Sequence, residues 1–167
     1  MLANFAVSCS LLAALSVPAF SEDAAGHHHG EAEHVSELGG VRIVHAWTRA
    51  TEDEEALVFF ELENGSDKTV TLIGGESEAA SAVALVGIDF KGGEAKLVPL
   101  PQVPVKPGSE LHLDPESLAL QLTGLTAPLK QGDVVEVEVQ LDLGHLDVDV
   151  EVEAADAKGH SHAGHSH

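Results

Sequence analysis

Sulfur and tyrosine are nearly absent from this chain of 167 residues. It contains one cysteine, one methionine and no tyrosine. Cys9 and Met1 both lie at the N-terminal end, so the rest of the chain has no thiolate or thioether. Disulfides, thiol nucleophiles and soft sulfur ligands for a metal are therefore excluded from everything that follows Cys9.

Basic residues are also scarce. Lysine and arginine together number 8, against 28 aspartates and glutamates, for a formal net charge of −20. Such a surface repels nucleic acids and anionic membranes, and it favours cations or basic proteins as partners. We expect most of the carboxylates to be solvated surface groups. No Ser/His/Asp order typical of a hydrolase is present, so the sequence does not indicate an enzyme.

The N-terminal residues are typical of a secretory signal peptide. An apolar run, Leu11–Phe20, precedes the small residue Ser21, and Ala19 lies two residues before it. The run is shorter than the roughly 18 apolar residues that a membrane span needs. We therefore expect export to the periplasm, removal of residues 1–21, and no membrane insertion afterwards. Cys9 precedes the run, too early for a lipid-attachment site.

Alternation of apolar and polar residues dominates the middle of the chain, and no helical period is sustained. Turn residues such as Gly74-Gly75 and Pro107-Gly108 separate the alternating runs. Many short strands at close spacing predict an antiparallel sandwich or barrel. The expected strands are Val41–Thr48, Ala56–Glu63, Thr69–Ile73, Ala82–Asp89, Ala95–Leu100, Glu110–Leu113, Leu118–Leu122, Asp133–Leu143 and Leu146–Glu153.

The last two of these strands predict a hairpin with Gly144-His145 as its two-residue loop. This loop would place Leu143 opposite Leu146 on the apolar face. On the other face it would place Glu138 opposite Glu151. We interpret that second face as a solvated acidic surface, with a weak cation site as the alternative.

Several short motifs follow one another in a characteristic order: Val44-His45-Ala46-Trp47-Thr48-Arg49-Ala50, Leu72-Ile73-Gly74-Gly75-Glu76-Ser77, Leu113-Asp114-Pro115 and Leu122-Thr123-Gly124-Leu125. In this order they resemble the PCuAC-type periplasmic copper chaperones. The resemblance implies an all-β fold, a cupredoxin-like or immunoglobulin-like antiparallel β-sandwich. It also implies a role in handling copper.

The same resemblance implies a copper site of histidines and methionines, a ligand set that suits Cu(I). In this chain the matching positions hold Val86, Leu97, Ala119 and Gln121. Three aliphatic side chains and an amide cannot replace those ligands, so we expect the family's site to be absent. The apolar residues should form a hydrophobic surface or an extension of the core.

Most of the 11 histidines lie outside the expected strands, in an N-terminal tail (residues 22–40) and a C-terminal tail (residues 156–167). Small, polar neighbours predict that both tails are disordered, yet flexible imidazoles can still wrap an ion. Without sulfur they should prefer Cu(II) to Cu(I), or bind zinc or nickel. Glu31, Glu33 and Asp156 could add oxygen ligands. The predicted metal ligands are His27, His28, His29, His34, His160, His162, His165 and His167.

The histidines within the strands give weaker signals. We expect His112 on the surface and His145 in the hairpin loop. His45 should share a face with Trp47 and form a hydrogen bond inside the sandwich.

These observations divide the chain into a signal peptide (1–21), the N-terminal tail (22–40), a PCuAC-like sandwich (41–155) and the C-terminal tail (156–167). We predict a periplasmic, copper chaperone-like protein that captures copper or zinc ions with its tails and passes them to a recipient metalloprotein. The alternatives are a zinc scavenger or buffer, and a metal-independent interaction module in an assembly pathway.

Metal uptake by the tails should depend strongly on pH. An unperturbed imidazole has a pKa of about 6.5, and imidazolium has no lone pair to offer a metal. We expect calorimetric titrations with Cu(II) or Zn(II) to show binding at about pH 7.5 that is largely lost at about pH 5. Equal uptake at both values would exclude histidine ligands.

Overall fold

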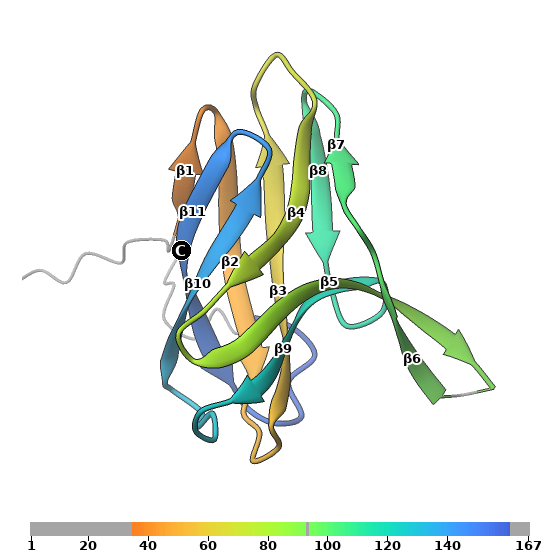
Figure 1. Cartoon of the computed structure of the whole chain (residues 1–167), viewed down its shortest axis with the longest axis vertical. Helices are drawn as coiled ribbons and strands as arrows, with labels where there is room; N and C mark the ends of the chain where they lie inside the picture. Colours follow the sequence, from red (N-terminus) through yellow and green to blue (C-terminus); the bar gives the residue numbers. More distant parts are fainter. Residues whose placement is uncertain (1–34, 93, 161–167) are drawn as a thin grey trace, which may run out of the picture.

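The computed structural model describes residues 35–92 and 94–160, and every regular element in these ranges is a β-strand (Figure 1). None of the described residues forms a helix long and apolar enough to cross a membrane. The strands are β1 (Ser36–Leu38), β2 (Val41–Arg49), β3 (Glu55–Asn64), β4 (Val70–Glu76), β5 (Ala80–Lys91), β6 (Glu94–Pro99), β7 (Val103–Val105), β8 (Ser109–Leu113), β9 (Leu118–Leu125), β10 (Val134–Leu141) and β11 (Gly144–Glu153).

The sheet closes on itself. Its strand order is β1-β2-β11-β10-β4-β5-β9-β3-β8, and a further pairing between β2 and β3 joins the two sides into a flattened barrel. The expected all-β antiparallel sandwich is therefore confirmed. One pairing departs from it, because β11 runs parallel to β2.

All of the expected strands are present, and two further strands were not predicted. β1 pairs with β2 although its three residues lie in the expected N-terminal tail, so the sheet begins before Val41. β7 pairs with β4 and is also only three residues long, with Pro104 at its centre. Strands so short show no clear alternation, and a proline argues against a strand everywhere except at an edge.

The predicted register of the last hairpin is wrong, although its faces are right. The turn lies at Asp142-Leu143, and Leu146 pairs with Val139 rather than with Leu143. Asp142 is held at the turn by β4, since its N–H donates to Thr71 O at 3.0 Å and its carboxylate accepts from Thr71 N–H at 3.0 Å. The register differs from the prediction by an even number of residues, so the apolar residues of both strands still face the core.

Two hydrophobic clusters lie on opposite faces of the wall formed by β2, β3, β9 and β5. The main core fills the interior and includes Phe60, Leu62, Leu72, Leu120 and Val137, all at most 2% exposed. The second cluster, here called the outer cluster, consists of Trp47, Phe59, Val86 and Ala119 on the outside of the same wall. Consecutive buried residues such as Phe59 and Phe60 therefore belong to different clusters.

Asn64 organises the turn between β3 and β4 from a buried position, 1% exposed. Its amide nitrogen donates to Lys68 O at 2.8 Å and to Val105 O at 2.9 Å, and its amide oxygen accepts from Ser66 N–H at 3.1 Å. We expect Asn64→Ala to lower the free energy of unfolding by about 2–3 kcal/mol, because buried carbonyls lose their donors. Urea denaturation measures the change in the free energy of unfolding, with Gln102→Ala, at an exposed amide, as the control. An equal decrease in both variants would contradict the role of Asn64 in the turn.

Candidate metal centre

The chain after β11 folds back onto the outer cluster. Ala157 packs against that cluster, and its carbonyl oxygen accepts a hydrogen bond of 2.7 Å from Nε of Arg49. The Arg49 guanidinium in turn lies over the rings of Trp47 and Phe59, 5.8 and 5.9 Å from their centroids. Arg49 thus attaches the start of the C-terminal tail to the sandwich and positions His160.

His160 lies against two carboxylates of β11. Its Nδ1 is 3.3 Å from Glu153 Oε1 and 3.8 Å from Glu151 Oε2. One ligand atom from each of the three residues lies within 4.8 Å of the other two. The side chains of His160 and Glu153 are only 11% and 10% exposed, whereas that of Glu151 is 36% exposed. We call Glu151, Glu153 and His160 the triad.

His45 lies beside the triad because β2 contains a bulge. Val44 pairs with Glu61 and Trp47 pairs with Phe59, so β2 has one extra residue between these pairs. His45 has a φ of 53°, in the left-handed region that residues other than glycine seldom adopt. Its imidazole is turned outward, 42% exposed, with its ring centroid 5.9 Å from that of His160. The expected hydrogen bond of His45 inside the sandwich is therefore wrong.

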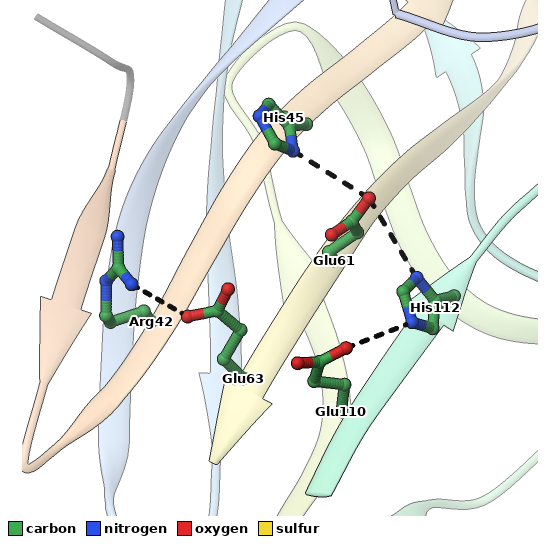
Figure 2. A network of polar contacts seen from close by, with 6 residues as sticks. All are labelled: Arg42, His45, Glu61, Glu63, Glu110 and His112. Atoms are coloured by element: carbon green, nitrogen blue, oxygen red, sulfur yellow. Dashed lines mark hydrogen bonds and ion pairs between the residues drawn. The ribbon is translucent and has the colours of Figure 1, made fainter. Parts of the chain in front are cut away.

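A row of imidazoles and carboxylates continues from His45 across β3 to β8 (Figure 2). The Glu61 Oε1 atom is 3.7 Å from His45 Nδ1 and 3.9 Å from His112 Nδ1. His112 Nε2 is also 3.5 Å from Glu110. His112 is on the surface as predicted, 52% exposed, but it is flanked by carboxylates. His145 lies in β11 rather than in the turn, 3.9 Å from Glu138.

Three histidines from distant parts of the chain line one hollow of about 240 Å³. They are His45, His112 and His160, with Glu61 between the first two, and Trp47 also lines the hollow. Imidazole nitrogens and carboxylate oxygens at such distances are the ligands that Zn(II) and Cu(II) prefer. The hollow and the adjoining triad are therefore a candidate metal centre.

Carboxylates along β11 lead toward this centre. Asp147 and Asp149 are exposed, Glu151 is half-buried, and Glu153 is buried beneath the C-terminal tail. In the adjoining strand Glu138 pairs with Asp147 and Glu136 with Asp149, so like charges face each other across the hairpin. Such a surface raises the local concentration of cations.

The structure brings together the four positions at which the PCuAC resemblance implies copper ligands. Val86 pairs with Ala119, Leu97 pairs with Ile88 two residues after Val86, and Gln121 lies two residues after Ala119 on β9. Val86 and Ala119 are buried in the outer cluster, against which Leu97 packs. Gln121 donates to Glu55 Oε2 at 3.1 Å. Val86, Leu97 and Ala119 extend the apolar packing, and none of the four residues offers a ligand for Cu(I).

Of the predicted tail ligands, only His160 falls within the described residues. The others lie outside them: His27, His28, His29, His34, His162, His165 and His167. No pattern in the sequence indicates that His160 lies beside Glu151, Glu153 and His45. The alternation of Glu151 and Glu153 on one face of a strand was visible, but their approach to His160 depends on the fold of the intervening segment.

A second, larger hollow of about 820 Å³ borders the outer cluster. Leu57, Phe59 and Leu97 provide apolar lining, and polar or charged residues complete it: Arg49, Thr51, Glu52, Asp53, Glu55, Gln121, Lys130 and Gln131. It adjoins the positions of the missing copper ligands but contains no histidine, cysteine or methionine among its lining residues. Within the described part of the chain, the histidine-lined hollow is thus distinct from this larger hollow, which has an apolar wall and no histidine.

Comparison with known proteins gives two sequence matches. A family model described as "Putative lipoprotein LpqE-like" matches residues 41–152. The protein "Putative lipoprotein Lxx21020" of Leifsonia xyli subsp. xyli (strain CTCB07) is 30% identical over 99 residues, which are 59% of this chain and 60% of that protein. The chain therefore spans less than two thirds of the length of this relative.

Solved structures with the same fold are PCuAC domains. The apo PCuAC domain of PmoF2 has a TM-score of 0.61 at 23% identity, over 75% of this chain and 99% of that one. The copper-bound PCuAC domain of PmoF2 has a TM-score of 0.61 at 21% identity, over 72% and 98%. The Cu(I) form of DR1885 from Deinococcus radiodurans has a TM-score of 0.50 at 25% identity, over 65% and 74%. The predicted PCuAC-type fold is confirmed.

Arg49 can be tested as the residue that holds the C-terminal tail. We expect Arg49→Ala to lower the free energy of unfolding by about 1–2 kcal/mol, through loss of a hydrogen bond and of the stacking on two rings. Hydrogen exchange of the Ala157 amide should become faster. Arg42→Ala, which removes a surface ion pair with Glu63, serves as control. Unchanged exchange in Arg49→Ala would contradict the role.

Proposed function

The chain belongs to the LpqE-like family, and we propose that it is an extracytoplasmic metal-binding protein that captures divalent copper, or zinc, and transfers the ion to a recipient metalloprotein. The copper-bound PCuAC domain of PmoF2 and the Cu(I) form of DR1885 share its fold and carry copper. These likenesses support copper as the cargo. The signal-like residues 1–21 and the lipoprotein names of its relatives support a location outside the cytoplasm.

The observation that carries this proposal is the position of His160. This first histidine of the C-terminal tail lies against Glu151 and Glu153, on the same outer face as the positions where the family's copper ligands would be. The apolar residues Val86 and Ala119 offer nothing to a metal there. The nitrogen and oxygen ligands at the adjoining edge favour Cu(II) or Zn(II) over Cu(I).

We propose ligand exchange as the mechanism. The tail histidines capture the ion, the carboxylates of β10 and β11 attract further ions, and a recipient with stronger ligands removes the cargo. Ordering the chain around a captured ion costs conformational entropy, which keeps the affinity per ion moderate and the exchange rapid. No step of this mechanism makes or breaks a covalent bond, and we assign no catalytic residue.

Substitution of the tail histidines tests this function in the full-length chain. Trimming to residues 41–155 would also remove β1 and the Ala157 contact, and so would disturb the fold. We therefore use alanine at the seven tail positions outside the described residues, with His160 retained: His27, His28, His29, His34, His162, His165 and His167. We expect the number of bound Cu(II) ions, measured by elemental analysis after desalting, to fall by at least about half.

The control replaces two serine residues of the C-terminal tail, Ser161→Ala and Ser166→Ala, and should leave the copper content unchanged. Protein purified without a nickel column avoids preloading. A wild-type chain that retains neither Cu(II) nor Zn(II) would refute the proposed function, and an unchanged copper content in the histidine variant would refute the role of the tails.

The apolar hollow supports a second candidate, an interaction module that acts without metal. Leu57, Phe59 and Leu97 line a space large enough for an inserted partner side chain or peptide. This alternative predicts a partner that stays bound in the presence of a chelator and after substitution of the tail histidines. Capture that disappears under either condition would favour the metal-handling function.

A further inference from the structure

We infer that the folded domain itself contains one defined binding site for a divalent transition-metal ion, formed by Glu151, Glu153 and His160 with His45 as the fourth ligand. This inference rests on the proposed function and deepens it, because it locates one ion within the domain rather than in the tails. The site differs from the PCuAC-type site in its residues, its ligand chemistry and its place on the wall.

The spacing of the triad suits a tetrahedral ion. Four ligands about 2.1 Å from a metal are separated from one another by about 3.4 Å along the edges of a tetrahedron. His160 Nδ1 lies 3.3 Å from one Glu153 oxygen and 3.8 Å from one Glu151 oxygen. These distances approach the edge length before any ion is bound, so little rearrangement of these groups is needed.

The charge of the triad favours a divalent cation. Two carboxylates approach each other on the outer face of β11, and Glu153 is a buried residue, 8% exposed. Burial of a carboxylate is costly unless a positive group compensates it. An imidazolium at His160 would offset one of the two negative charges, whereas a divalent ion offsets both.

His45 lies outside the group of ligand atoms that are within 4.8 Å of one another, but its ring is beside that of His160, and we propose that it moves toward the ion to become the fourth ligand. The bulge in β2 turns its ring outward, with the ring centroid 5.9 Å from that of His160. Its Nδ1 faces Glu61 Oε1 at 3.7 Å (Figure 2). The proposed ligand for the ion is therefore the other ring nitrogen, Nε2. Metal-binding histidines commonly direct the second ring nitrogen to a carboxylate in this way. His112 shares the same Glu61 oxygen and keeps that carboxylate oriented.

Two imidazoles and two carboxylates define the class of ion. Mg²⁺ and Ca²⁺ prefer sites made of oxygen alone, and Cu(I) prefers sulfur. The set fits Zn(II) and, with adjustment of geometry, Cu(II). Co(II) is a spectroscopic substitute for Zn(II), because tetrahedral Co(II) absorbs strongly in the visible range.

The experiment uses the full-length chain with the seven outlying tail histidines replaced by alanine, so that His160 is the last tail imidazole. Titration with Zn(II), and with Co(II) followed by visible absorption, should give one ion per chain and a tetrahedral spectrum. Glu153→Gln and Glu151→Gln should each weaken Zn(II) binding at least about tenfold. His45→Asn should do the same, and asparagine tolerates the positive φ at this position.

Glu136→Gln is the matched control, since it removes one charge from the same acidic hairpin at an exposed position. It should change Zn(II) affinity less than about twofold. Thermal unfolding in the presence of a chelator verifies that each variant is folded. If Glu153→Gln fails to fold, His45→Asn and Glu151→Gln still decide the question, because both side chains are more exposed.

The outcomes separate this inference from the proposed function. If the seven-histidine variant binds no Zn(II) or Co(II) while the wild-type chain does, the tails alone bind metal and the domain site is refuted. Equal losses of Zn(II) affinity in Glu151→Gln and Glu136→Gln would also refute the domain site, because binding would then depend on net charge alone. Absence of binding in the wild-type chain refutes the proposed function itself.

Discussion

β2 must pair with β3 on one side and with β11 on the other, and closure of the barrel depends on both pairings. The extra residue in β2 allows both pairings. It also changes which residues of β2 face inward. Before the bulge Val41 and Ile43 enter the main core, and after it Ala46 does, so Trp47 is directed to the outer cluster. Without the bulge, regular alternation would direct His45 into the interior. The same constraint therefore creates the outer cluster and exposes an imidazole beside it.

The outer cluster in turn determines where the C-terminal tail begins. Trp47 and Phe59 would present large apolar surfaces on the outside of the wall, and Arg49 and Ala157 cover part of them. Val86 and Ala119, at positions where the PCuAC resemblance implies copper ligands, complete this packing. Apolar residues occupy those positions, and nitrogen and oxygen ligands lie next to them on the same outer face. The two features depend on each other. The apolar residues supply the contact that holds the start of the C-terminal tail in place. The nitrogen and oxygen ligands lie where this segment places His160.

The alternation of apolar residues was sufficient to predict most of the strands and the all-β fold, because most strands bury at least one face. It could not predict the hairpin register, which depends on the hydrogen bonds between Asp142 and Thr71 from another strand. Nor could it predict the approach of His160 to Glu153, since the bond from Arg49 to Ala157 joins residues far apart in the chain. His45 was misplaced for a related reason. A bulge inverts the inward–outward alternation of side chains along β2, and no residue type in Val44-His45-Ala46 predicts a bulge.

The arrangement of the ligands has a consequence for release of the ion. Glu151 and Glu153 belong to a central strand and His45 to its neighbour, so three of the four proposed ligands are fixed by the barrel. His160 belongs to a segment attached mainly by the Arg49 bond and the packing of Ala157. Local opening of such a segment costs far less free energy than global unfolding. An ion that binds the closed form stabilises it by mass action. A recipient that competes for His160 would therefore open the site without disturbing the sandwich, which is the property that transfer by ligand exchange requires.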